Sequence, residues 1–187
     1  MMAALRSLPA AAAALLLAIG SAAAAVPEPE GYRQDDYRAD VPNTVAGGQT
    51  IHTKALEALL RHGRAVPIDV LPAPRRPAGM RPGQPWMPEP HRSISGSLWL
   101  PDVGRGALSP DLEQWFRDRL SRIAAGDWNR PFVFYCLSRC WMSWNAAKRA
   151  ASYGYRRVYW YPDGADGWEK AGLPTAEATP EGPAATN

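Results

Sequence analysis

The two cysteines of this chain, Cys136 and Cys140, both lie in the stretch FVFYCLSRCWMSWNAAKRA. The apolar run before Cys136 predicts a strand, and the residues after Cys140 predict a helix. Loop amides and the positive end of a helix favour an anion at such a place, and therefore a thiolate. Cys136 is thus a candidate nucleophile. The alternative is a buried cysteine that packs as a small hydrophobic side chain.

The second cysteine adds a choice of chemistry. A disulfide can join Cys136 to Cys140 if a compact turn brings their Cα atoms within about 7 Å. Cys136 would then attack a substrate and Cys140 would resolve the product, either a disulfide or a persulfide on Cys136. Packing at the helix start is the alternative role for Cys140. The residues support sulfur or redox chemistry without deciding between the two.

The N-terminus has the features of a secretory signal peptide. Arg6 precedes an apolar stretch over residues 10–19, and Ala23, Ala24 and Ala25 form a small-residue cleavage site. We therefore expect residues 1–25 to be removed and the mature chain to work in the periplasm, where disulfides persist. The apolar stretch is too short and alanine-rich for a membrane span, so none is expected after cleavage.

Composition narrows the classes of function. The remaining length fits one domain. A formal net charge of +3 is too weak to predict nucleic-acid binding. The sequence has no nucleotide-binding loop, no Cys-x-x-Cys-His haem site and no cluster of metal ligands, so neither a metal nor a covalently bound cofactor is predicted. It also lacks the glycines of a serine hydrolase nucleophile elbow.

Strand-like and helix-like segments alternate along the chain. Strands are expected at residues 65–70, 97–101, 132–135 and 157–161, and helices at 111–125, 144–153 and 165–171. A further helix, capped by Thr50 or Thr53, is expected to end at Gly63. The run at 132–135 is apolar throughout, as in a strand buried on both faces. This order predicts an α/β fold with a central, mostly parallel sheet and helices on both faces.

Three other segments lack this pattern. Residues 26–49 form an N-terminal extension. Residues 71–90 contain seven prolines and are predicted to form a loop insertion, in which Trp86 either docks on the domain, covers the site or contacts a partner. Residues 175–187 are predicted to be a disordered tail.

Several motifs together resemble the rhodanese-like domain family. Tyr135-Cys136, Asn145-Ala146-Ala147 and the run from Gly154 to Tyr159 are similar to its active-site segment. The run from Gly164 to Pro174 is similar to its closing helix, Pro67-Ile68-Asp69-Val70 to its first conserved strand, and the run from His91 to Pro101 to the segment that follows. The resemblance covers residues 50–174 and implies a single rhodanese-like domain with sulfurtransferase chemistry at Cys136.

Within this family the chain looks closest to exported proteins named for pyrroloquinoline quinone (PQQ)-dependent catabolism and a CXXCW motif. Gly31-Tyr32-Arg33 and the run from Cys140 to Asn145 carry this resemblance, although three residues rather than two separate the cysteines here. It implies an association with PQQ-dependent alcohol catabolism, and a periplasmic dehydrogenase or cytochrome as a partner. PQQ enters only through this resemblance.

The resemblance also assigns roles around the cysteines. Substrate contacts are expected from the residues that surround the nucleophile, Leu137, Ser138, Arg139, Trp141 and Met142. Asp69 and His91 are expected to support neighbouring loops through hydrogen bonds. Sulfurtransferase loops usually carry glycine at the place of Arg139, and often arginine or a similar polar residue at that of Trp141. Arg139 is expected to resist the left-handed backbone that glycine permits.

Three hypotheses remain open. Cys136 carries sulfane sulfur as a persulfide between small thiols or protein acceptors. Alternatively, Cys136 and Cys140 exchange electrons with a partner of the alcohol-oxidation system. In the third, the domain is a non-enzymatic binding module that supports a PQQ enzyme.

Overall fold

The sheet at the centre of the molecule has five parallel strands. The structure, a computed structural model, describes residues 26–183, so the predicted signal peptide lies outside the described residues. The strands follow the order β1-β6-β5-β2-β4, which places β5 (Phe132–Tyr135) in the middle. The others are β1 (Gln49–Thr50), β2 (Val66–Asp69), β4 (Leu98–Trp99) and β6 (Val158–Trp160). A separate antiparallel pair joins β3 (Arg92–Ile94) to β7 (Thr175–Glu177).

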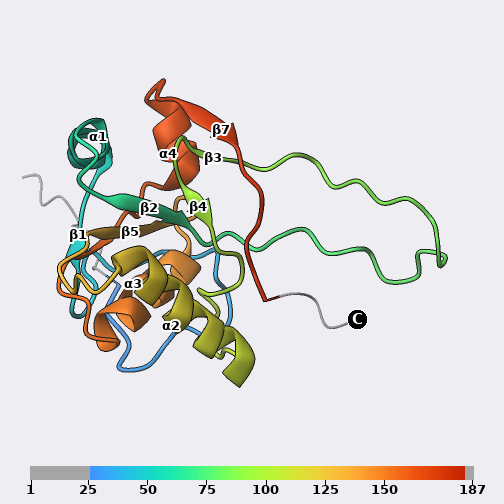
Figure 1. The fold of residues 1–187 in the computed structure, drawn as a ribbon, viewed down its shortest axis with the longest axis horizontal. Coiled ribbons are helices and arrows are strands. Elements are labelled where there is room, and N and C mark those ends of the chain that lie inside the picture. Colours follow the sequence, from blue (N-terminus) through green and yellow to red (C-terminus); the bar gives the residue numbers. More distant parts are fainter. Residues whose placement is uncertain (1–25, 184–187) are drawn as a thin grey trace, which may run out of the picture.

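Within residues 26–183, four helices cover the two faces of this sheet (Figure 1). In that view α1 (Thr53–Arg61) and α4 (Gly164–Lys170) lie above it, and α2 (Pro110–Ala124) and α3 (Trp141–Ser152) lie below. The predicted α/β architecture with helices on both faces is therefore confirmed. Among the described residues, no helix is long and apolar enough to span a membrane.

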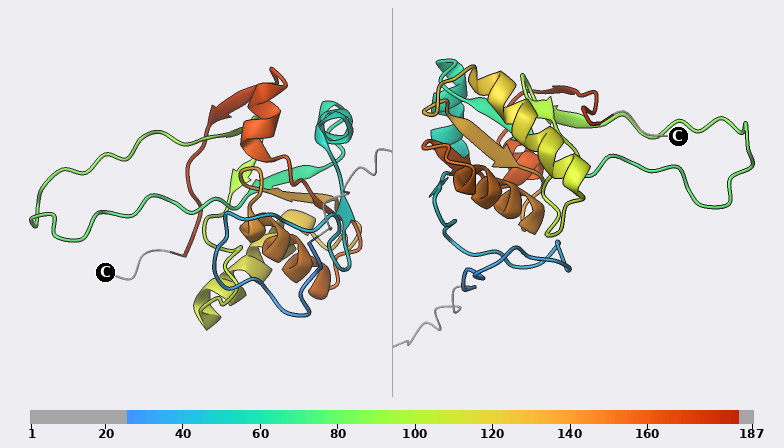
Figure 2. Two further views of the ribbon diagram at one scale, coloured as in Figure 1. Left: turned by 180° about the vertical axis from the view of Figure 1, so that it is seen from behind. Right: turned by 60° about the horizontal axis from the view of Figure 1, so that its bottom comes forward.

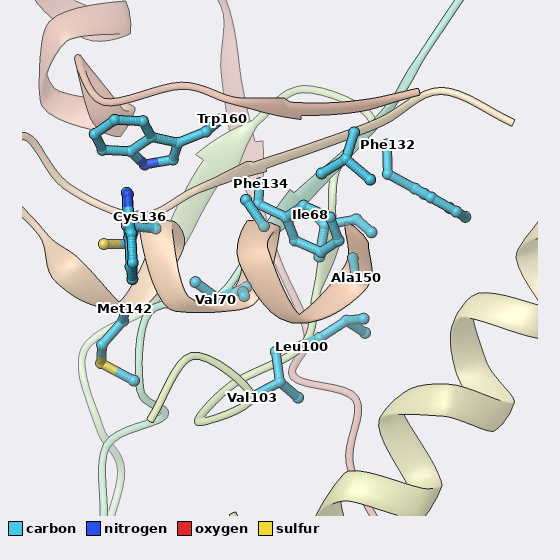
Figure 3. Packing of buried hydrophobic residues seen from close by; sticks show 14 of the residues in the cluster. Ile68, Val70, Leu100, Val103, Phe132, Phe134, Cys136, Met142, Ala150 and Trp160 are labelled. Atoms are coloured by element: carbon cyan, nitrogen blue, oxygen red, sulfur yellow. The ribbon is translucent and has the colours of Figure 1, made fainter. Parts of the chain in front are cut away.

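The side chains of β5 connect both halves of the core. Phe132 and Phe134 pack in the cluster between the sheet and helices α2 and α3. Val133 and Tyr135 pack in the cluster between the sheet and helices α1 and α4. All four are fully buried, because successive side chains of a strand point to opposite faces. Cys136 follows directly and lies in the first cluster with Trp160 and Met142 (Figure 3). Cys136, at the end of the central strand, is therefore part of the packed core.

Local signals explain two helix starts differently. Ser109 caps α2 through its hydroxyl, which accepts a hydrogen bond from Leu112 N, and Pro110 occupies the first helical position, one residue before the predicted start. Helix α3 begins at Trp141, three residues before the predicted start at Trp144. The loop between the cysteines is correspondingly tight, with Cys140 itself as the residue before the helix.

The tail differs from the prediction. Residues 175–177 form β7 against β3 instead of remaining disordered. Beyond it, Glu181 donates its backbone N–H to Trp99 O and forms a two-pronged ion pair with Arg119. Pairing with an exposed strand edge supplies hydrogen bonds that composition does not reveal. Residues 184–187 lie outside the described residues.

Residues 71–90, hereafter the arm, form neither helix nor strand. They leave the domain after β2, turn back at residues 81–84 and return to β3, projecting far from the body in all three views (Figures 1 and 2). Trp86 is partly buried on the arm itself, and Met87 beside it is 90% exposed.

Candidate functional site

A disulfide joins the two cysteines. Cys136 follows β5, Cys140 precedes α3, and their Cα atoms lie 6.4 Å apart. Both residues are almost fully buried, with exposed fractions of 1% and 3%. The carboxyl edge of a parallel sheet is the usual ligand-binding edge of such folds, so the position suits chemistry. In the oxidised state, however, solvent hardly reaches either sulfur.

The turn between the cysteines depends on a left-handed residue. Arg139 adopts a φ of 52°, the conformation that the sequence leads one to expect only from glycine. The expectation that arginine resists this backbone is therefore wrong here. Within the described chain, the amides of Leu137, Arg139 and Cys140 donate to no protein acceptor. These three N–H groups are therefore free to stabilise a negatively charged sulfur.

Helix α4 fixes the other side of residues 136–140, hereafter the cysteine loop. Ala165 N donates to Cys136 O at 2.8 Å, and Ser138 donates its N–H and its hydroxyl to the Asp166 carboxylate at 2.6 and 2.5 Å. Gly164 packs so closely that an added Cβ would lie 2.2 Å from Leu137 C. The loop can therefore occupy this position only because residue 164 has no side chain.

The Asp166 carboxylate is held in its charged form. Partial burial raises its pKa, but the hydrogen bonds from Ser138, together with those from the backbone of Asp166 and Gly167, outweigh burial and keep the pKa below its ordinary value. A lowered folded-state pKa means that the contribution to stability is present above the unfolded-state pKa and is lost as the pH falls through the folded-state pKa. The anchor of the cysteine loop is thus intact at neutral pH.

Residues 26–49, hereafter the strap, cross the outer side of α3 (Figure 2). Tyr37 O accepts a hydrogen bond from Trp141 N at 2.9 Å, and Asp40 forms an exposed ion pair with Arg139. Lys148 donates to three strap carbonyls, those of Pro29, Glu30 and Gly31. The strap therefore covers the helix that follows the disulfide.

Asn145 joins the strap to the domain. It is fully buried; its amide donates to Arg33 O and Gly104 O, and its oxygen accepts from Arg33 N. Gly104 in turn lies against α3, where an added Cβ would meet Met142 O at 2.2 Å. This contact and the strap close the start of α3 from two sides.

The predicted substrate-contacting residues divide into two groups. Leu137, Ser138 and Arg139 lie on the cysteine loop and retain solvent exposure. Trp141 and Met142 are buried, with exposed fractions of 3% each. The Trp141 ring packs edge-on against Trp144 with ring centres 5.3 Å apart. The Trp141 ring nitrogen has no hydrogen-bond partner among the described residues. The Arg33 guanidinium of residues 26–49 lies 5.5 Å from the centre of the Trp141 ring, so substrate contact with Trp141 requires the strap to move.

The two predicted supporting residues contact each other rather than the cysteine loop. His91 Nε2 lies 2.8 Å from Asp69 Oδ2, and Asp69 Oδ1 accepts from Leu71 N. Ser93 donates its hydroxyl to Asp69 Oδ2 at 2.7 Å. Asp69 pairs in register with Tyr135, one residue before Cys136, on the adjacent strand. This cluster fixes both ends of the arm beside the site.

Replacing Asn145 should open the site. Asn145→Ala leaves the buried Gly104 carbonyl and the partly buried N–H and C=O groups of Arg33 unpaired, at a cost of about 1–3 kcal/mol for a fully buried group. We expect the disulfide to be reduced at least about tenfold faster by a water-soluble phosphine, since about 1.4 kcal/mol corresponds to that factor. Asp40→Ala, which removes only the exposed ion pair with Arg139, is the matched control and should change the rate little. Equal rates for wild type and Asn145→Ala would show that the strap does not limit access.

The structure adds functional positions that the sequence reasoning did not assign. Gly164 and Asp166 hold the cysteine loop, and Asn145 holds the strap. All three occur in the motifs that resemble rhodaneses, but their partners are 26 (Gly164 to Ser138) to 112 residues away in sequence. A pattern along the chain cannot show such pairings.

A five-stranded parallel sheet, helices on both faces and a cysteine after the central strand together define an α/β domain of the rhodanese type. Residues 52–171 match the rhodanese-like domain family, and the chain belongs to this family. No curated protein sequence matches the chain.

The solved structures that resemble the chain are distant from it in sequence. A thiosulfate sulfurtransferase from Pseudomonas aeruginosa is 17% identical with a TM-score of 0.49, over 72% of this chain and 21% of that one. The chain thus spans about a fifth of that enzyme. A human single-domain sulfurtransferase is 22% identical with a TM-score of 0.41, over 66% of this chain and 96% of that one. A polysulfide-sulfur transferase from Wolinella succinogenes is 18% identical with a TM-score of 0.43, over 72% of this chain and 81% of that one.

Proposed function

We propose that this protein is an exported sulfur-transfer protein in which Cys136 accepts sulfane sulfur and Cys140 resolves it. The observation that carries the proposal is the bonded pair, Cys136 and Cys140, at the carboxyl end of the central strand. A single cysteine suffices to carry sulfur. A second cysteine in bonding contact supplies a way to release it.

The steps balance with one dithiol as co-reactant. The Cys136 thiolate attacks the terminal sulfur of a polysulfide, forms a Cys136 persulfide and leaves a polysulfide one sulfur shorter. The Cys140 thiolate then attacks Cys136 Sγ, so the outer S–S bond breaks, hydrosulfide leaves and the disulfide forms. A dithiol protein reduces the disulfide and is itself oxidised to a disulfide. The bonded state described above is the product of the second step.

The place of action is part of the proposal. The signal-like residues 1–25 support export to the periplasm, where a disulfide state persists. The resemblance to CXXCW-motif proteins supports an association with PQQ-dependent alcohol catabolism, with a dehydrogenase or cytochrome as a neighbour. In this proposal PQQ belongs to that neighbour, and the present chain handles only sulfur.

A second candidate function is thiol–disulfide exchange without sulfur transfer. The near-equal burial of Cys136 and Cys140 favours it, because neither sulfur is singled out as the exposed acceptor. This function needs both thiols equally, whereas persulfide formation needs only Cys136. The two candidates therefore differ in what Cys140→Ser retains.

The test uses the reduced mature protein and one equivalent of inorganic polysulfide. We expect one hydrosulfide released in the resolving step per protein, with the protein losing two hydrogens as the disulfide forms. Cys140→Ser should stop at a stable persulfide, seen as one added sulfur that reductant removes. Disulfide formation in the wild type, with no added sulfur on Cys140→Ser, would leave thiol–disulfide exchange as the function.

A further inference from the structure

The arm is presented in a fixed direction. At its base, Trp99 Nε1 donates to Leu71 O at 2.6 Å, and the Trp99 ring packs on His91 with ring centres 4.1 Å apart. Ala178 N donates to His91 O, which ties the returning limb to the tail. Together with the bonds to Asp69, these contacts clamp both ends of the arm.

The tip of the arm is also held in shape. Arg76 on the outgoing limb donates to the carbonyls of Arg81 and Gln84, which close the turn. The residues that follow, Pro85-Trp86-Met87-Pro88-Glu89-Pro90, alternate proline with side chains in the pattern that extended polyproline segments use for recognition. Ordering such a segment costs little entropy on binding, because proline has already fixed much of its backbone.

A large apolar side chain is left in water on this arm. Met87, at 90%, and Trp128, at 53%, are the two exposed large hydrophobic side chains of the described chain. Trp128 lies against Tyr155 with ring centres 5.3 Å apart. Trp128 and Tyr155 line a hollow of about 170 Å³, hereafter the aromatic hollow. Its other lining residues are Arg117, Asp118, Ser121 and Tyr153. A thioether binds well against such rings.

Charges on the two surfaces are complementary. The arm carries Arg75, Arg76 and Arg81 against Glu89, and Arg81 forms no ion pair within the described residues. Asp118 on the wall of the hollow and Asp127 beside Trp128 also lack a cationic partner in the described part of the chain. The cation that lines the hollow, Arg117, is itself paired with Glu113. A basic tip is therefore attracted by Asp118 on the wall of the hollow and by Asp127, the residue before Trp128.

The hollow and the base of the arm lie at opposite edges of the sheet. The arm leaves just past the carboxyl end of β2, whereas Trp128 and Tyr155 precede the amino ends of β5 and β6. The strands are parallel, so these ends face opposite ways. Each limb, of about ten residues at about 3.1 Å per residue, reaches about 30 Å.

We propose that the arm of one copy docks Trp86 and Met87 in the aromatic hollow of a second copy, and that the exchange is reciprocal. A two-fold dimer uses the same two surfaces twice, so both arms contribute to the area of about 1,200–2,000 Å² that a stable interface buries. The dimer accounts for both exposed hydrophobic side chains at once. It does not depend on the chemistry of the cysteines.

The test measures the mass in solution of the mature protein by size exclusion with light scattering. We expect a dimer for the wild type. For Met87→Ser and for Trp128→Ser we expect weaker dimerisation, with a dissociation constant at least tenfold higher. Lys54→Ser, an exposed change on α1, is the control and should leave the dimer intact.

Mixing the two variants separates docking from misfolding. Met87→Ser keeps an intact hollow and Trp128→Ser keeps an intact arm, so one of the two contacts is complete in the mixed pair. We expect heterodimers from the mixture at concentrations where each variant alone is monomeric. A wild type that is monomeric at high concentration, dimers that survive both substitutions, or a mixture that stays monomeric would each overturn the proposal.

Discussion

Cys136→Ser is expected to abolish sulfur loading, with a loss of about 10³-fold or more in the transfer rate. The hydroxyl of serine is not ionised at neutral pH and cannot replace the thiolate that attacks sulfane sulfur. The fold should persist, because Cys136 is one small member of a large cluster. The measurement is the rate at which the reduced protein takes up sulfur from polysulfide and releases it as hydrosulfide, with circular dichroism to verify folding.

Cys140→Ser is the matched control at the same site. It removes the same disulfide and is equally buried, so any loss of stability through the bond is shared by both variants. We expect it to accept sulfur at a rate near that of the wild type and to transfer the sulfur only to external thiols. Sulfur loading of Cys136→Ser at the wild-type rate would refute the assignment of the nucleophile.

Gly164→Ala is expected to displace the cysteine loop and to destabilise the domain. An alanine there adopts a left-handed φ of 69° and places its Cβ 2.2 Å from Leu137 C and 2.3 Å from Ser138 N. These neighbours are backbone atoms, so the loop must shift and lose the hydrogen bonds to Asp166. In urea, the free energy of unfolding should fall by at least about 2 kcal/mol more than the strain of a left-handed alanine alone would cause. The disulfide should also form more slowly.

Gly172→Ala supplies the control for the backbone. Its φ of 71° is nearly the same, but no heavy atom lies within 4 Å of the added Cβ. Only the strain of left-handed alanine, about 1–2 kcal/mol, is expected. If both variants lose the same stability and form the disulfide at the same rate, close packing of α4 on the cysteine loop has no role.

Much of the fold could be predicted because its signals are local. The apolar run at β5, the Ser109 cap of α2 and the glycines after helices act within a few residues, and the parallel alternation follows from their order. Cys136 could be placed at a strand end for the same reason. The order of the tail could not be predicted in this way, because β7 is held by hydrogen bonds to β3, which lies more than 80 residues away in sequence.

The covering of the site was also beyond local signals. The strap has no helix or strand before β1, and its order depends on Asn145, Lys148 and the backbone of Trp141. The left-handed Arg139 contradicts a propensity argument because tertiary contacts on both sides of the loop override it. Residue identities located the chemistry, whereas long-range contacts decide how accessible it is.

The most direct measurement is the intact mass of the mature protein, isolated from its own compartment without reductant and compared with its reduced form. The account predicts a mass lower by two hydrogens, which reports the Cys136–Cys140 disulfide left after hydrosulfide release. One additional sulfur, lost on reduction, would report the persulfide step that precedes it. Two free, unmodified thiols would contradict the claim that these cysteines act as one sulfur-handling pair.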